Sequence, residues 1–97
     1  MYKELVFYLE ACESGSMFTS LPNNTKILAI SAANPDESSW ATYCSPGDEV
    51  GGKNIGSCLG DLFSVSWMED TDGGCVCIES LQSQITIVKQ KTDKVFK

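Results

Sequence analysis

Apolar residues gather in two short runs in the first third of the chain, and polar turns follow each of them. Residues 5–11 read LVFYLEA and residues 26–33 read KILAISAA. Nearly continuous apolar runs of this length are typical of strands that are buried on both faces of a parallel sheet. We therefore predict strands over 5–11 and 26–33, with about one helical turn between Ser16 and Leu21.

Apolar residues recur at helical spacing later in the chain, over about 59–69 and again over 79–91. We predict a helix in each segment, although the β-branched run at 85–88 also suits a strand. Residues 44–58 form a Gly-rich loop with few apolar residues, and loops of this length are often functional. Strands that alternate with helices indicate an α/β domain with a mostly parallel sheet flanked by helices. Two strands cannot close a core, so we expect further, N-terminal strands to lie outside this chain.

The charge and composition of the chain argue against two classes of partner. The net charge is −6, Arg is absent, and the seven Lys are scattered, so no cluster of cations could bind nucleic-acid phosphates. No apolar run approaches the roughly 18 residues that cross a bilayer, so we expect no membrane span. No secretory signal follows Met1, and we therefore expect a cytosolic protein, a mature form or a fragment.

The five cysteines are odd in number, so at least one is unpaired within the chain. Cys75 and Cys77 form a CxC pair. This is a weak metal signal, because a zinc site takes four ligands and the chain contains no His. We predict no metal site and no cofactor.

Cys12 follows the predicted strand 5–11 directly, at the edge where parallel α/β sheets bind ligands. Glu10 lies two residues earlier, and on a strand this spacing puts both side chains on one face. Gly15 lets the backbone turn tightly, which would leave nearby amides free for an oxyanion. These residues suit a cysteine nucleophile. The local pattern leaves open that Cys12 is a buried apolar side chain and that Glu10 is a strand-end charge.

Four blocks of the sequence together resemble the legumain family of asparaginyl endopeptidases, also called vacuolar processing enzymes. The blocks are FYLEACESGSMF at 7–18, SAANPDESSWATYC at 31–44, CLGDLFSVSWMEDTD at 58–72 and ESLQSQITIVKQKT at 79–92. The resemblance implies a caspase-like α/β fold, of which residues 1–97 would be the C-terminal part of the catalytic domain. It also implies a cysteine endopeptidase of the vacuole or lysosome that cleaves peptides and proteins after Asn, more weakly after Asp, and that could also act as a transpeptidase.

The same resemblance assigns roles to individual residues. Cys12 matches the nucleophile. Glu10 and Asp61 match the acidic walls of the pocket for the substrate Asn, and Ser38 and Ser39 match residues that line it. A pocket specific for a primary amide needs fixed acceptors for its two N–H donors, which these residues could supply.

Three further residues are assigned by the resemblance. Trp40 matches an aromatic residue that helps to bind the substrate chain, although a packing role for this side chain remains an alternative. Cys44 and Cys58 match a disulfide that closes the loop 44–58 in plant members of the family. We expect this bridge in a lumenal protein.

The family takes its catalytic base from a His-Gly pair and the cation of its pocket from an Arg, both in earlier segments. This chain has neither His nor Arg. We therefore expect a fragment that is inactive without the missing N-terminal part of its own domain, with a Cys12 thiol that titrates like an ordinary cysteine. Two alternatives remain open: a catalytic subunit like that of the glycolipid-anchor transamidase, and a catalytically dead binding module.

Overall fold

The computed structural model describes residues 2–74 and 79–93, and these residues belong to two compact units. The first unit is Met1–Ser39 and the second is Trp40–Lys97. Cys75 and Cys77, which form the CxC pair of the sequence, lie outside the described residues.

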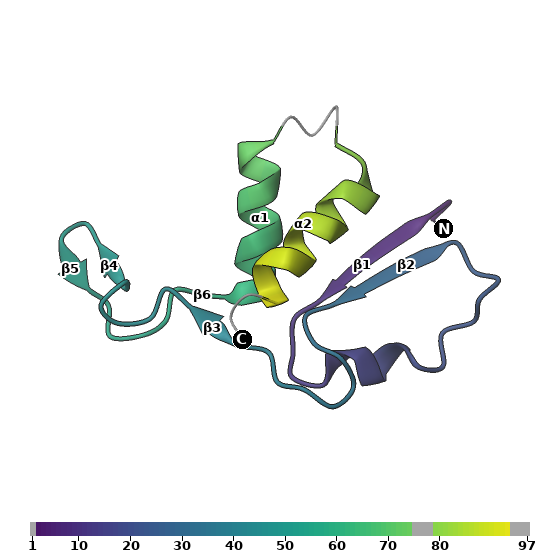
Figure 1. The fold of residues 1–97 in the computed structure, drawn as a ribbon, viewed down its shortest axis with the longest axis horizontal. Helices are drawn as coiled ribbons and strands as arrows, with labels where there is room; N and C mark the ends of the chain where they lie inside the picture. The colour runs from purple at the N-terminus through teal and green to yellow at the C-terminus, as the bar shows by residue number, and fades with distance from the viewer. Residues whose placement is uncertain (1, 75–78, 94–97) are drawn as a thin grey trace. The chain divides into compact units, whose positions relative to one another are not determined.

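The first unit is built on two parallel strands, β1 at Leu5–Leu9 and β2 at Ile27–Ser31. They pair in register, from Leu5 opposite Ile27 to Leu9 opposite Ser31 (Figure 1). The segment between them contains a short 3-10 helix, η1, at Ser14–Phe18, which lies earlier than the helical turn predicted from Ser16.

Both strands are shorter than the apolar runs that predicted them. The bond from the Ala32 N–H to the Leu9 carbonyl (2.9 Å) closes the pairing at its carboxyl end. Glu10 and Ala11 then leave the sheet, so the predicted strand 5–11 ends two residues early, and the predicted strand 26–33 is shortened to 27–31. The strands are also not buried on both faces within this chain: among their larger apolar side chains, those of Val6, Phe7 and Leu28 are 36–44% exposed.

The second unit begins with short antiparallel pairings that the sequence pattern did not predict. Strand β3 at Ala41–Thr42 pairs with β6 at Gly60–Asp61, and β4 at Glu49–Val50 pairs with β5 at Lys53–Asn54. Hence the segment 44–58, predicted as a loop, contains a hairpin. Its two-residue turn is Gly51-Gly52, with φ values of +58° and +77°. A tight hairpin turn with two left-handed residues strongly favours glycine at both positions.

Two helices complete the second unit and pack on each other, α1 at Leu62–Gly73 and α2 at Leu81–Asp93 (Figure 1). Helix α1 starts three residues later than predicted, because Gly60 and Asp61 pair with β3 instead. Helix α2 is displaced by two residues from the predicted 79–91, and the β-branched run at 85–88 is helical rather than extended.

The buried side chains of the helix pair are Phe63 and Ser66 on α1 and Val88 on α2. A hydrogen bond from the Gln84 side chain to the Thr71 hydroxyl (3.0 Å) joins the two helices. Neither helix of the described part combines the length and the apolar character that a membrane crossing requires.

Candidate active site

The Cys12 side chain is exposed and unbridged, three residues beyond the end of β1. Its Sγ lies 3.7 Å from the carbonyl oxygen of Ser39 and 3.8 Å from the Ser39 hydroxyl. Cys12 is therefore not the buried apolar side chain that the local pattern left open. The structure brings the predicted nucleophile together with a residue that the resemblance placed in the substrate pocket.

Hydrogen bonding with Ser39, first through its backbone and then through its hydroxyl, lowers the pKa of the Cys12 thiol below its ordinary value. A hydrogen bond with the Ser38 side chain acts in the same direction, while partial desolvation and the Glu13 charge oppose it. A hydroxyl that donates to sulfur stabilises the thiolate, which is the nucleophilic form. Cys12 was expected to titrate like an ordinary cysteine because the chain lacks His, whereas its bonds with the two serines lower its pKa.

The turn that carries Cys12 is held by backbone hydrogen bonds. Glu13 adopts a left-handed conformation with φ 55°, and the helical turn of η1 starts at the next residue. The N–H of Glu13 donates to the Glu37 carbonyl (2.7 Å), that of Gly15 to the Ala33 carbonyl (2.9 Å), and that of Ser16 to the Glu13 carbonyl (2.9 Å). These three amides are committed to the fold, so the prediction that the amides near Gly15 remain free for an oxyanion is wrong for them.

Gly15 has a different role from the one predicted. Its φ is not in the left-handed region, and the residue that turns the chain is Glu13. A Cβ at position 15 would lie 2.9 Å from Cδ of Pro35 and 3.0 Å from the Ala33 carbonyl oxygen. Glycine is required here because two segments of backbone approach closely.

Glu10 is half-buried and lies between the end of β1 and Cys12, with its Oε1 atom shielded from solvent. Glu10 and Cys12 both follow the last residue of the strand. A two-residue spacing therefore does not put them on one face of a strand. A pocket that both side chains share is implied by the resemblance alone.

Trp40 and Asp61 lie near each other in the second unit. The Leu62 N–H donates to the Trp40 carbonyl (2.8 Å), and Asp61 pairs with Ala41 across β3 and β6. Trp40 is 52% exposed, which does not fit the alternative role of a core aromatic. Asp61 stands at the N-cap of α1, but its side chain makes no capping bond, so the helix does not engage this carboxylate.

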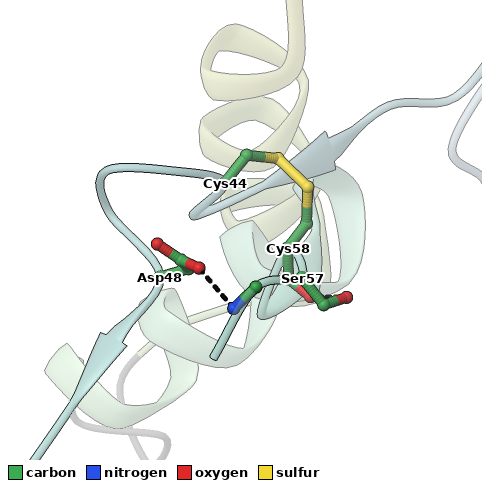
Figure 2. The surroundings of a disulfide bond; sticks show 5 residues. Cys44, Asp48, Ser57 and Cys58 are labelled. Atoms are coloured by element: carbon green, nitrogen blue, oxygen red, sulfur yellow. Dashed lines mark hydrogen bonds between the residues drawn. A yellow bond between two sulfur atoms is a disulfide. The ribbon is translucent and has the colours of Figure 1, made fainter. Parts of the chain in front are cut away.

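The expected bridge between Cys44 and Cys58 is present, with a sulfur–sulfur distance of 2.01 Å (Figure 2). It closes the segment that contains the β4–β5 hairpin. Asp48 is buried inside this segment at 1% exposure, and its Oδ2 accepts a hydrogen bond from the Gly56 N–H (2.7 Å), which Figure 2 shows as a dashed line. The sequence reasoning did not single out Asp48, because an acidic residue in a polar loop gives no sign that it will be buried.

The part of the chain that the structure describes contains no group of three or more Cys, Asp or Glu side chains placed to hold a metal ion. The arrangement at Cys12, with Ser38 and Ser39 beside its sulfur, suits the chemistry of a thiolate.

Known proteins with similar sequences include vacuolar-processing enzymes and legumain. The chain is 52% identical over 93 residues to a vacuolar-processing enzyme of Vicia sativa, covering 94% of this chain and 19% of that protein. It is 47% identical over 91 residues to the vacuolar-processing enzyme delta-isozyme of Arabidopsis thaliana, covering 93% and 20%. Legumain of Mus musculus is 45% identical over 93 residues, covering 96% and 20%.

The chain thus spans about a fifth of the length of these relatives. The model of the Peptidase C13 family matches residues 1–96. The resemblance predicted from the four sequence blocks is confirmed, and the chain belongs to the Peptidase C13 family.

Proposed function

We propose that the protein containing this chain is a cysteine endopeptidase that cleaves after Asn, and more weakly after Asp, with Cys12 as its nucleophile. The observation that carries the proposal is the exposed Cys12 sulfur beside the Ser39 carbonyl and hydroxyl in a chain of the Peptidase C13 family. The names of the relatives, vacuolar-processing enzyme and legumain, support a location in the vacuole or lysosome.

In this proposal the Cys12 thiolate attacks the carbonyl carbon of the substrate Asn. The peptide C–N bond breaks, the amine leaves with a proton from a general acid, and water then hydrolyses the thioester. If an amine takes the place of water, the result is transpeptidation. Glu10 and Asp61 accept hydrogen bonds from the Asn side-chain amide, Ser38 and Ser39 line the pocket, and Trp40 contacts the substrate chain.

Residues 1–97 contain no His, the residue that most often acts as a general base. We propose that the base comes from an N-terminal part of the same domain, together with the cation of the Asn pocket. The lowered pKa of Cys12 raises the thiolate fraction, but it supplies no acid for the leaving amine. Residues 1–97 alone are therefore expected to be inactive.

An electrophilic probe tests this proposal. A peptide that ends in Asn and carries a thiol-reactive group should label the full-length protein at Cys12 much faster than the same peptide ending in Ala. The chain of residues 1–97 should react equally slowly with both probes. The Cys12→Ser variant of the full-length protein is the control and should lose the labelling.

Two outcomes would contradict the proposal. Equal labelling of the full-length protein by the Asn and Ala probes would remove the specificity and favour the alternative of a dead binding module. Robust hydrolysis of an Asn reporter by residues 1–97 alone would show that no outside base is needed.

A further inference from the structure

Ser14 makes a pair of contacts that the proposed chemistry does not use. It is 1% exposed and is the first residue of η1, two positions after Cys12. Its Oγ accepts a hydrogen bond from the Ala33 N–H (3.1 Å) and donates to the Ala33 carbonyl oxygen (3.4 Å). A hydroxyl can donate and accept at the same time, so one side chain binds both backbone groups of Ala33.

Ala33 belongs to the segment that leads from β2 to the serines of the site. It is itself buried at 4% exposure, two residues beyond the end of β2. The chain between Ala33 and Ser39 is a compact turn, in which the Asn34 N–H donates to the Glu37 carboxylate (2.7 Å). Ala33 therefore lies at the start of the segment that leads to Ser39.

The turn that follows Cys12, residues 13–15, is bonded to this segment at two places, Ala33 and Glu37. Ser14 and the Gly15 N–H hold Ala33, and the Glu13 N–H holds the Glu37 carbonyl. Ser39 follows the second of these ties by two residues.

We propose that Ser14 is a positioning residue for the Cys12 nucleophile, which clamps Ala33 and so holds Ser39 beside the sulfur. The proposal rests on the proposed function only in treating Cys12 as the nucleophile. Ser14 acts through Ser39, so its loss changes the ionisation of Cys12. A hydroxyl that served only to stabilise the turn would leave that ionisation unchanged.

The test is the pH dependence of iodoacetamide alkylation at Cys12 in residues 1–97, with the labelled peptide resolved by mass spectrometry. Because only the thiolate reacts, the rate against pH gives the titration midpoint. In Ser14→Ala the midpoint should move up toward that of an ordinary cysteine. The rate at neutral pH should fall about fivefold, the factor that one hydrogen bond typically contributes to an equilibrium.

Ser31→Ala is the matched control. The Ser31 hydroxyl donates to the same Ala33 carbonyl oxygen (3.0 Å), but from β2 rather than from the turn that follows Cys12. Its removal should leave the alkylation profile of the wild type unchanged. Equal shifts in Ser31→Ala and Ser14→Ala would overturn the proposal, because loss of any bond to Ala33 would then be enough.

A double substitution tests whether Ser14 acts through Ser39. In wild type, Ser39→Ala should raise the titration midpoint of Cys12, whereas in a Ser14→Ala background it should add nothing. Additive shifts would mean that the two serines act independently, and that Ser14 does not position Ser39.

Ser14→Thr keeps the hydroxyl and should keep the wild-type titration midpoint of Cys12. If Ser14→Ala does not fold, the Ser14→Thr variant still tests the proposal. A folded Ser14→Thr variant with a raised midpoint, or a wild-type chain with the midpoint of a free cysteine, would overturn the proposal. No substrate is turned over in these measurements. A chain without peptidase activity can therefore pass them, and an unchanged Ser14→Ala profile would leave the peptidase proposal standing.

Discussion

Gly15 and Pro35 approach each other so closely that a Cβ on Gly15 would lie 2.9 Å from Cδ of the Pro35 ring. Gly15 lies in the turn after β1 and Pro35 in the segment after β2. Their close approach shows that this turn and this segment are tightly packed against each other. The Ala33 carbonyl, 3.0 Å from the same Cβ position, leaves no room on its side either.

Gly15→Ala should therefore destabilise the first unit. The added methyl group pushes apart the turn that carries Cys12 and the segment that leads to Ser39, and overpacking of this kind typically costs about 1–3 kcal/mol. The measurement is amide hydrogen exchange in the β1–β2 ladder, which gives the free energy of opening of this unit. Gly73→Ala is the control, because a Cβ there has no neighbour within 4 Å and sits in helix α1. Unchanged protection in Gly15→Ala would contradict the packing argument.

The sequence predicted the parallel strand pair and the two helices well, because their apolar patterns are strong. It misplaced their ends, since the last ladder bond and the start of a turn depend on tertiary partners: β1 stops at Leu9 where Ala32 makes its bond. Membership of the Peptidase C13 family implies the caspase-like α/β fold that was expected.

The candidate site was predicted from resemblance rather than from physical pattern. Spacing on a strand was used to pair Glu10 with Cys12, and the strand ends before both residues. The clamp between Ser14 and Ala33 and the burial of Asp48 had no signal in the sequence, because a polar residue in a turn is usually exposed. The bond between Ser14 and Ala33 joins residues 19 positions apart, and Asp48 is bonded inside its own loop, to Gly56 eight positions away.

The disulfide should contribute strongly to the stability of the second unit. Cys44 and Cys58 are 14 positions apart, and closing a loop of this size contributes about 3 kcal/mol in the chain-entropy model. The free energy of unfolding of the Cys44→Ser/Cys58→Ser variant should be lower than that of the wild type by up to this amount. Urea unfolding monitored by Trp fluorescence is the measurement, because both Trp residues belong to this unit. Cys12→Ser is the control and should unfold like the wild type.

Asp48 should hold the disulfide-closed segment from within. Asp48→Ala leaves the Gly56 N–H without its carboxylate acceptor (2.7 Å in the native structure), and an unmade bond of this kind costs about 1–3 kcal/mol. Asp48→Asn keeps an oxygen acceptor and removes the charge, so it should cost less. Thermal unfolding of the two variants at neutral pH gives the comparison. An Asn variant as unstable as the Ala variant would show that the charge of Asp48, not its acceptor, holds the segment.

Glu79, which lies beside Asp70, should make the stability of the helix pair depend on pH. Their carboxyl groups line an open hollow of about 500 Å³ together with Glu69 and Lys91. Burial first, then the charge of Asp70 and a hydrogen bond with it, raise the pKa of Glu79, while Lys91 acts in the opposite direction. Burial and a neighbouring like charge both disfavour the ionised form of a carboxyl group, which explains the direction of this shift.

A raised pKa in the folded state means that folding favours the protonated form of Glu79. Its contribution to stability is complete below the ordinary pKa of a glutamate and is lost as pH rises through the raised value. Glu79→Gln mimics the protonated form, so it should unfold at a higher temperature than the wild type at neutral pH and at the same temperature below the ordinary pKa. Thermal unfolding followed by circular dichroism over this pH range is the measurement. Asp72→Asn is the control, because it removes an exposed carboxylate near the C-terminal end of α1. If its unfolding temperature rises as much as that of Glu79→Gln, the effect comes from net charge alone.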